Sequence, residues 1–239
     1  IPFVYRVHEQ PSEDKLQTLK EVLDLLGINS RGIERGVSSK RLSGVIDRAQ
    51  GKSYYSIVNN QVLRAMAKAK YSENPVGHYG LSLENYAHFT SPIRRYPDLM
   101  IHRILTDLVC GGEQKSIERR YRKAVHEAAL QSTNTELTAM RVERDCDDCF
   151  KAEYMKSHIG ETFDGIISSV TSNGIYVELP NTVEGMVRLD SLEGQYQYDG
   201  YFQVKELGGG KNYRVGDRAR VQCVAADVNS GNIDFIMAD

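Results

Sequence analysis

Apolar positions change their spacing once along the chain. Up to about residue 157 they recur mainly every three or four residues, which is typical of amphipathic helices. From residue 160 onward apolar and polar positions alternate, as they do along strands with one buried face. This change predicts an α+β protein with two domains, a mainly helical one over residues 1–157 and a β domain over residues 158–239.

The helical part opens with a short alternating segment, PFVYRVHE, that predicts a strand. Pro11 and Ser12 then precede a helix whose first turn is acidic and which we expect to end at Gly27. The residues that form apolar stripes on this helix and the next two are Leu16, Leu19, Leu23 and Leu26, then Leu42, Val45, Ile46 and Ala49, then Val62, Leu63, Met66 and Ala69. A last helical stretch covers residues 116–157, and the capping-box spacing of Thr133 and Glu136 allows a new helix to begin there.

Alternating segments follow Gly160 in the order TFDGIISSVT, GIYVEL, VEGMVRLD, RARVQCVAAD and NIDFIMA. A long loop separates the third segment from the fourth. Five short strands divided in this way predict a five-stranded Greek-key barrel of the OB-fold type. Such barrels bind oligonucleotides on the face formed by strands two and three.

Several aromatic and basic residues of the β domain are candidates for RNA binding. We expect Tyr176 on strand two and Arg188 on strand three to lie on the binding face, with Phe163 beside them on strand one. Phe163 and Tyr176 would equally suit the interior of a small barrel. In the long loop, Tyr196 and Tyr198 are candidates for stacking on unpaired bases. The same rings would also serve to hold the loop against the helical part.

A basic corner lies within residues 89–103, FTSPIRRYPDLMIHR. Pro92 and Pro97 each fix φ and lack a backbone donor, so we expect a turn capped by Ser91 and then a helix that begins at Pro97. The side chains that this helix is expected to bury are Ile101, Ile104, Leu105 and Leu108. Arg94 and Arg95 would then lie on a rigid bend that suits bidentate phosphate binding. The plainer interpretation is the start of a helix with two solvated arginines.

The overall charge of −2 identifies no partner, but its distribution is informative. Residues 1–157 carry 24 Lys and Arg against 20 Asp and Glu, whereas residues 158–239 carry 6 against 12. An acidic β domain cannot gain most of its affinity for nucleic acid from counterion release, so stacking and hydrogen bonding would have to supply it.

The four cysteines include one C-x-x-C pair, Cys146 and Cys149, without a second pair to complete a zinc site. We therefore expect these two to be buried thiols. No segment has the pattern of a signal peptide or a membrane span, so a cytoplasmic protein without membrane association is the expectation.

The stretch from His78 to Arg103, HYGLSLENYAHFTSPIRRYPDLMIHR, resembles the catalytic domain of the ribonuclease II and ribonuclease R family. The segment from GETFDGIISSV to GNIDFIMA resembles the C-terminal OB-type RNA-binding domain of the same proteins. The resemblance covers nearly the whole chain, and the SPIRRYPDL motif is long enough to be specific. It implies the C-terminal part of a ribonuclease II-type catalytic domain followed by an OB-fold RNA-binding domain.

The resemblance also implies a function. The family degrades single-stranded RNA processively from the 3′ end to nucleoside 5′-monophosphates, with magnesium held by a cluster of aspartates. By resemblance, Arg94 stabilises the phosphate under attack and Glu143 lies near the active site, while Arg95 is expected to contact RNA. An exposed helical glutamate is the alternative interpretation of Glu143.

The metal-binding aspartates of the family lie upstream of the segment that matches residue 1. The similar local string is Asp145, Asp147 and Asp148, but on a helix the first and last share a face while Asp147 points elsewhere. We therefore expect this chain to hold no metal, to be inactive alone and to need the N-terminal half of the enzyme as a partner. The alternative is a non-catalytic single-stranded RNA-binding or regulatory protein derived from that family.

Overall fold

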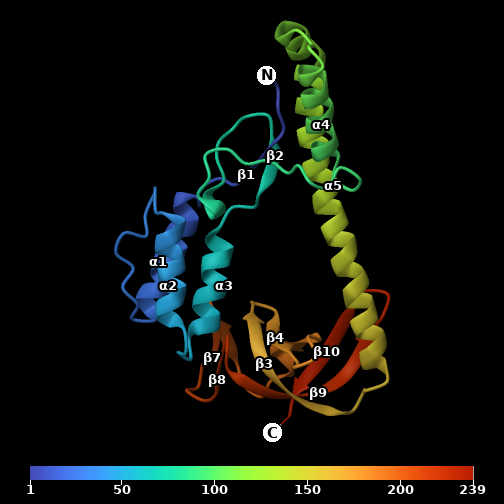
Figure 1. Ribbon diagram of the computed structural model, residues 1–239. Coiled ribbons are helices and arrows are strands. Elements are labelled where there is room, and N and C mark those ends of the chain that lie inside the picture. The colour runs from blue at the N-terminus through green and yellow to red at the C-terminus, as the bar shows by residue number, and fades with distance from the viewer. Residues whose placement is uncertain (239) are drawn as a thin grey trace. The chain divides into compact units, whose positions relative to one another are not determined.

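The computed structural model describes residues 1–238, which form two compact units. Unit 1 comprises residues 1–48 and 61–140, and unit 2 comprises residues 49–60 together with the chain from residue 141 onward. Helices make up most of unit 1, whereas unit 2 contains a β-barrel (Figure 1). The predicted combination of a helical part and a following barrel is confirmed.

The three predicted apolar stripes correspond to three helices, which are α1 (Glu13–Leu25), α2 (Ser39–Ala49) and α3 (Tyr55–Ala65). Gly27 follows the end of α1 with a φ of +69°, a conformation that glycine adopts without steric cost. The third stripe was predicted wrongly in part, since Leu63 is 61% exposed and α3 ends at Ala65, before Met66 and Ala69. The buried face of α3 runs through Val58, Val62 and Ala65, and a helix rotates Leu63 away from that line.

The predicted N-terminal strand is confirmed as β1 (Tyr5–Val7), which pairs antiparallel with β2 (Lys70–Ser72). A single turn of 3-10 helix, Tyr79–Leu81, follows β2. An isolated bridge between His8 and His78 extends the contact between the segments that contain β1 and β2.

The main core of this part of unit 1 lies between α4 (Tyr96–Val109) and the first half of α5 (Gln114–Lys156), which run side by side (Figure 1). The buried residues of this core are Val4, Tyr71, Met100, Ile101, Ile104, Ile117, Tyr121, Val125, Ala128 and Ala129. The expected burial of Ile101 and Ile104 is confirmed, and Leu105 is half-buried against the same cluster. Leu108 is 39% exposed, because it lies in the last turn of α4 beyond this cluster.

The new helix expected at Thr133–Glu136 does not occur, because α5 continues without interruption from Gln114 to Lys156. Thr133 Oγ1 donates to the Ala129 carbonyl oxygen at 2.9 Å and accepts a hydrogen bond from the Tyr71 N–H at 3.0 Å. The hydroxyl that would have capped a new helix therefore stabilises the contact of α5 with β2.

The five predicted strands of the β domain are all present. They are β3 (Thr162–Val170), β4 (Gly174–Glu178), β5 (Glu184–Arg188), β9 (Arg218–Asp227) and β10 (Asn232–Met237). They form a closed barrel in the order β10-β5-β4-β3-β9, in which β10 and β5 are parallel and the other pairs are antiparallel. A 3-10 turn, Leu189–Ser191, follows β5.

Phe235 fills the interior of the barrel, where it is only 2% exposed. A Cβ atom on Gly185 would lie 2.5 Å from its ring, so the register of β5 against β10 requires glycine at this position. Cys223 is also buried in this unit. The expectation of buried thiols on α5 is wrong for Cys146, which is exposed, and Cys149 is half-buried.

The predicted long loop is not a loop throughout, because it forms a small antiparallel sheet. Its strands are β6 (Tyr196–Tyr198), β7 (Gln203–Glu206) and β8 (Asn212–Arg214). Across residues 1–238, no helix combines the length and the apolar composition needed to cross a membrane.

Candidate nucleic-acid interface

The basic corner is a tight turn over residues 92–94 that leads directly into α4. The Ser91 carbonyl oxygen accepts hydrogen bonds from the N–H groups of Arg94 and Arg95 at 3.3 and 3.0 Å. The cap at Ser91 is therefore made by its backbone rather than by its side chain. Helix α4 begins at Tyr96, and Pro97 occupies its first turn as predicted.

Asp98 joins both ends of this turn. Its carboxylate is fully buried, and Oδ2 accepts hydrogen bonds from the Ser91 N–H and from Arg95 Nη2, each at 2.8 Å. The position of Asp98 in the first turn of α4 also places its charge near the positive end of the helix dipole. Asp98 Oδ1 and Arg95 Nε are buried without a hydrogen-bond partner within residues 1–238. Arg95 is thus committed to holding the corner.

Arg94, unlike Arg95, is not paired with an acidic side chain of residues 1–238. It is exposed, and within the part of the chain that the structure describes it forms no side-chain hydrogen bond or ion pair. The preceding residue, Ile93, is 102% exposed, so the two side chains stand at the tip of the turn. The corner therefore holds one arginine rigidly and leaves the other available for a ligand.

Aromatic and histidine side chains support the corner from α4 and from β2. His102 donates from Nε2 to the Phe89 carbonyl oxygen at 2.8 Å, and its ring stacks on that of Phe89 at 4.3 Å. The Tyr71 hydroxyl lies 2.9 Å from His88 Nδ1. Burial lowers the pKa of His88, and the positive charge of Arg95 lowers it further.

An ion pair extends this support to α5. Arg6 on β1 binds both carboxylate oxygens of Glu136, with Nη1–Oε2 and Nη2–Oε1 distances of 2.6 and 3.1 Å. The Arg6 guanidinium also lies 4.7 Å from the centre of the Tyr71 ring. These contacts fix β1, β2 and α5 relative to one another within unit 1.

On the barrel, the register places Tyr176 and Arg188 on the same outer face. Tyr176 is half-buried on β4 opposite Met186 of β5, and Arg188 lies two residues further along β5, opposite Gly174. Such diagonal neighbours on one face are within reach of long side chains. Arg188 is exposed, and its ion pair with Asp190 is loose at 3.4 Å. The structure thus brings these two predicted contacts together.

Phe163 lies elsewhere on the barrel. It pairs with Val221 of β9, whereas β3 pairs with β4 only from Ile166 onward. Phe163 is on the same side of β3 as Gly165 and Ile167, which are both buried. Its ring centre is 6.3 Å from that of His158. Phe163 is therefore not grouped with Tyr176 and Arg188, and its contact with RNA stays a prediction.

Tyr196 and Tyr198 belong to β6 of the small sheet. The rings of Tyr196 and Tyr213 lie 5.8 Å apart across this sheet, and the Tyr198 hydroxyl donates to the Tyr201 carbonyl oxygen at 3.3 Å. Burial raises the pKa of Tyr196, and the neighbouring Tyr213 and Glu206 raise it further. These tyrosines are ordered by contacts within their own sheet, and their stacking on bases stays a prediction.

Two family models match the chain. Residues 1–111 match the RNB domain, and residues 156–237 match the S1 RNA binding domain. Ribonuclease R 1 of Lactococcus lactis is 38% identical over 237 residues, and ribonuclease R of Aquifex aeolicus is 40% identical over 237 residues. Both alignments cover 98% of this chain. The chain belongs to the ribonuclease R and ribonuclease II family.

Solved structures of ribonuclease R agree with this assignment. The apo form of Mycoplasma genitalium RNase R gives a TM-score of 0.89 at 28% identity, covering 100% of this chain and 38% of that protein. The same enzyme in complex with ribose methylated single-stranded RNA gives a TM-score of 0.88. The chain spans 29% of the Lactococcus lactis ribonuclease R and 33% of the Aquifex aeolicus one, so it corresponds to about a third of these relatives.

The remaining predicted residues of this ribonuclease family member are on α5. Glu143 is exposed and belongs to unit 2, whereas Arg94 belongs to unit 1, so its place near an active site stays a prediction. Asp145 and Asp147 are exposed, while Asp148 is half-buried. Among the residues that the structure describes, no group of three or more His, Cys, Asp or Glu is placed to hold a metal ion. The expectation that this chain alone holds no metal stays a prediction.

Sequence reasoning missed three residues that shape the corner of this ribonuclease family member, namely Asp98, His88 and His102. A signal for Asp98 was present, because an acidic residue in the first turn of a helix is a usual partner for nearby N–H groups. No sequence spacing pointed to His88 or His102, because each comes close to its hydrogen-bond partner only in the folded chain.

Proposed function

We propose that this chain is the C-terminal part of a processive 3′-to-5′ exoribonuclease that hydrolyses single-stranded RNA to nucleoside 5′-monophosphates. The observation that supports the proposal most is the state of Arg94. This side chain is exposed at the tip of a turn whose other arginine is fastened to a buried aspartate. The turn fixes the backbone of Arg94, and no partner in residues 1–238 competes with a phosphate for its guanidinium.

In this proposal Arg94 contacts the scissile phosphate. Negative charge increases on the phosphate oxygens during the attack, so a guanidinium beside them stabilises the transition state more than the ground state. Arg95 and Asp98 hold the turn at the correct angle, and the contact of Arg95 with RNA becomes indirect. On the barrel, Tyr176 stacks on an unpaired base of the same RNA while Arg188 binds a phosphate.

We further propose that magnesium is held by the complete enzyme and that this chain alone holds none. The donor set of residues 1–238 supports this, because it offers no suitable cluster of acidic or histidine side chains. The isolated chain is then inactive, and an N-terminal half of the enzyme is its partner in catalysis. A cytoplasmic location and the absence of membrane association complete the proposal.

The test compares the chain alone with the chain combined with an upstream half that carries the aspartate cluster. The chain alone with magnesium should release no nucleoside monophosphate from 3′-labelled RNA, and the combination should release it. In the active combination, Arg94→Ala should lower kcat by about 10²- to 10³-fold, as removal of a group that stabilises the transition state does. The control is Arg119→Ala, which removes an exposed arginine of α5 and should leave kcat unchanged. Hydrolysis by the pure isolated chain, or an active Arg94→Ala enzyme, would contradict the proposal.

A second candidate is a non-catalytic RNA-binding or regulatory protein of the same family. The observation that favours it is the combination of an intact barrel with a donor set that does not fit a metal in the described residues. In that case the chain binds single-stranded RNA, and no upstream half restores hydrolysis. The gene sequence upstream of Ile1 separates the two candidates, since an in-frame aspartate cluster supports the enzyme and a start codon directly before Ile1 supports the binding protein.

A further inference from the structure

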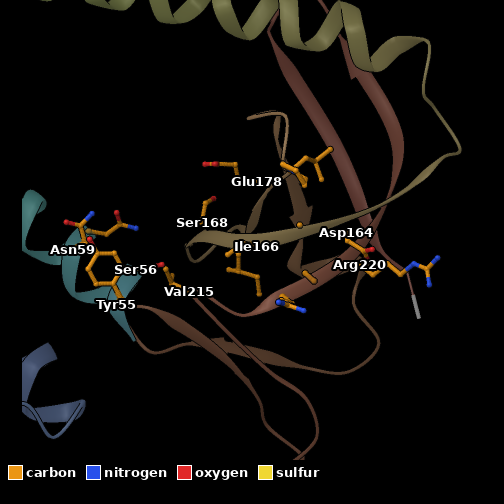
Figure 2. A pocket seen from close by; sticks show the side chains of 16 residues that line it. Tyr55, Ser56, Asn59, Asp164, Ile166, Ser168, Glu178, Val215 and Arg220 are labelled. Atoms are coloured by element: carbon orange, nitrogen blue, oxygen red, sulfur yellow. The ribbon is translucent and has the colours of Figure 1, made fainter. Parts of the chain in front are cut away.

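Unit 2 contains a cleft of about 880 Å³. None of the residues predicted to contact RNA is part of its lining. One wall is the first half of α3, and the other is the outer side of β3 and β9 (Figure 2). A volume of this size is in the range of sites that hold small organic ligands. Most of the strand residues that line the cleft belong to β3 and β9, with Glu178 added from the end of β4, whereas Tyr176 and Arg188 lie farther along β4 and on β5.

A turn that precedes β9 lies beside the cleft, and Val215 at its start is part of the lining. Gly216 has a φ of +92°, and a Cβ atom there would lie 3.5 Å from the Ser53 carbonyl oxygen and 3.8 Å from the Ser56 Cβ. The Gly216 N–H donates to the Ile167 carbonyl oxygen at 2.8 Å, and the Ile167 N–H donates to that of Asp217 at 2.9 Å. The turn is therefore fastened to β3 and approaches the start of α3 closely.

The α3 wall of the cleft is uncharged, since its lining residues are Tyr55, Ser56, Asn59 and Asn60. Figure 2 shows Ser56 and Asn59 of α3 across from Ile166 and Ser168 of β3, with Glu178 of β4 beside Ser168, while Asp164 and Arg220 lie farther along the strands. Uncharged amide and hydroxyl groups suit the edge of a nucleobase, which both donates and accepts hydrogen bonds.

Two side chains at the rim are exposed apolar surfaces. Tyr55 is 38% exposed and Ile166 is 51% exposed. Flat aromatic and aliphatic groups of this kind stack on unpaired bases, and each stacked base contributes substantially to affinity. The side chains of Tyr55, Ser56 and Asn59 form no hydrogen bond within residues 1–238, so their polar groups are free to bind a ligand.

A cation, Arg218, also lines the cleft. Arg218 on β9 is the register partner of Ile166 on β3, and it is exposed. It forms no ion pair among the residues that the structure describes. An arginine beside a wall of uncharged amide and hydroxyl groups is an arrangement that suits one nucleotide, with the base at that wall and its phosphate at the guanidinium.

We propose that this cleft binds one unpaired nucleotide of single-stranded RNA, as a second contact separate from the face of Tyr176 and Arg188. Tyr55 stacks on the base, the Asn59 amide hydrogen-bonds its edge, and Arg218 binds the phosphate. This inference rests on the proposed function to the extent that the chain must bind RNA. Specificity at this nucleotide comes from the amide, since stacking alone tolerates every base.

The experiment measures binding of the full chain to a fluorescent single-stranded oligomer of about ten nucleotides, a length within the range that one OB-fold covers. Tyr55→Ala should raise Kd between about fivefold and a hundredfold, the effect of losing one stacked base. Asn59→Leu keeps the size of the side chain and should raise Kd about fivefold or more. The matched control is Asn229→Leu, at an exposed turn outside the cleft, which should leave Kd unchanged.

A crosslinking arm uses the unaltered chain, so it does not depend on the folding of any variant. An oligomer that carries photoreactive 4-thiouridine should crosslink to Tyr55, and mass spectrometry of the peptides locates the bond. A nucleoside 5′-monophosphate should compete only weakly, because the strand also binds the β4–β5 face. Equal affinity for the free monophosphate would overturn the assignment to an RNA strand.

The experiment distinguishes a failure of the cleft proposal from a failure of the proposed function. If the chain binds the oligomer and Tyr176→Ala weakens binding, while Tyr55→Ala and Asn59→Leu behave like Asn229→Leu and no crosslink forms at Tyr55, the cleft is not an RNA site. The proposed function then stands. If the unaltered chain does not bind single-stranded RNA at all, both the proposed function and this inference are wrong.

Discussion

Asp98 and Arg95 form an ion pair across the first turn of α4, with the aspartate wholly buried and the arginine side chain 21% exposed. The same carboxylate oxygen accepts the Ser91 N–H, so one atom holds both ends of the turn that carries Arg94. The second oxygen and the guanidinium Nε are buried without a partner in the described part of the chain. Removal of either charge would leave the other one largely buried without its partner.

Removal of the aspartate should destabilise unit 1 strongly. Asp98→Ala leaves a largely buried arginine without its counter-charge, and breaking such a pair costs about 3 kcal/mol or more. The measurement is urea unfolding followed by circular dichroism. The control is Asp190→Ala, which breaks the exposed pair with Arg188 and should cost about 1 kcal/mol at most. Equal effects of the two substitutions would show that the Asp98 pair contributes little.

Stability should fall as the pH is lowered through the histidine range. Burial lowers the pKa of His88 and of His78 in the folded protein, so below the ordinary histidine pKa of about 6.5 the unfolded chain takes up protons that the folded chain does not. The free energy of unfolding should therefore be lower at pH 5 than at pH 7.5. His88→Gln should reduce this difference, and His88→Gln combined with His78→Gln should reduce it further. A difference that is unaffected by both substitutions would assign the pH dependence to other groups.

The barrel should reject a side chain at Gly185. Gly185→Ala places a methyl group against the Phe235 ring, and overpacking of this kind costs about 1–3 kcal/mol. Phe235→Leu should partly restore the stability of the Gly185→Ala variant, which a double-mutant cycle of unfolding free energies would detect. Gly208→Ala is the control, because a Cβ atom at Gly208 meets no atom within 4 Å. An additive cycle would mean that Gly185 and Phe235 do not compete for space.

Tyr176 and Arg188 should affect RNA binding in different ways. Tyr176→Ala should raise Kd about fivefold or more at every salt concentration, because stacking does not depend on counterions. Arg188→Ala should also lower the slope of log Kd against log salt by about 1, because one phosphate contact is lost. Fluorescence anisotropy at several salt concentrations measures both quantities. If the slope responds to Tyr176→Ala and not to Arg188→Ala, the assigned roles are reversed.

The sequence was sufficient to predict the barrel because its strands follow the simplest rule. Each of the five alternates buried and exposed residues over several positions, as Ile175 and Val177 alternate with Tyr176 on β4. The strands of the small sheet contain only three or four residues each, which is too short for an alternating pattern to be distinguished from a loop. Local patterns therefore identified the long elements and missed the short ones.

Contacts between distant segments explain most of the other differences. Thr133 has the local signature of a helix cap, but its hydroxyl is committed to Ala129 and to Tyr71 of β2. The corner was predicted from its two prolines, which act locally. Its dependence on Asp98 could not be predicted, because no sequence pattern shows that the Asp98 carboxylate is buried. The distinct roles of Arg94 and Arg95 likewise became visible only once the partner of Arg95 was known.

Unit 2 takes residues 49–60 from a stretch that lies between two parts of unit 1, so the polypeptide passes from one unit to the other three times. A gene truncated to begin at residue 158 would encode the barrel without the wall that carries Tyr55 and Asn59. Affinity measured on such a shortened product would report the β4–β5 face alone. Deletion mapping would then assign too little of the RNA-binding energy to the tail and too much to the preceding helices.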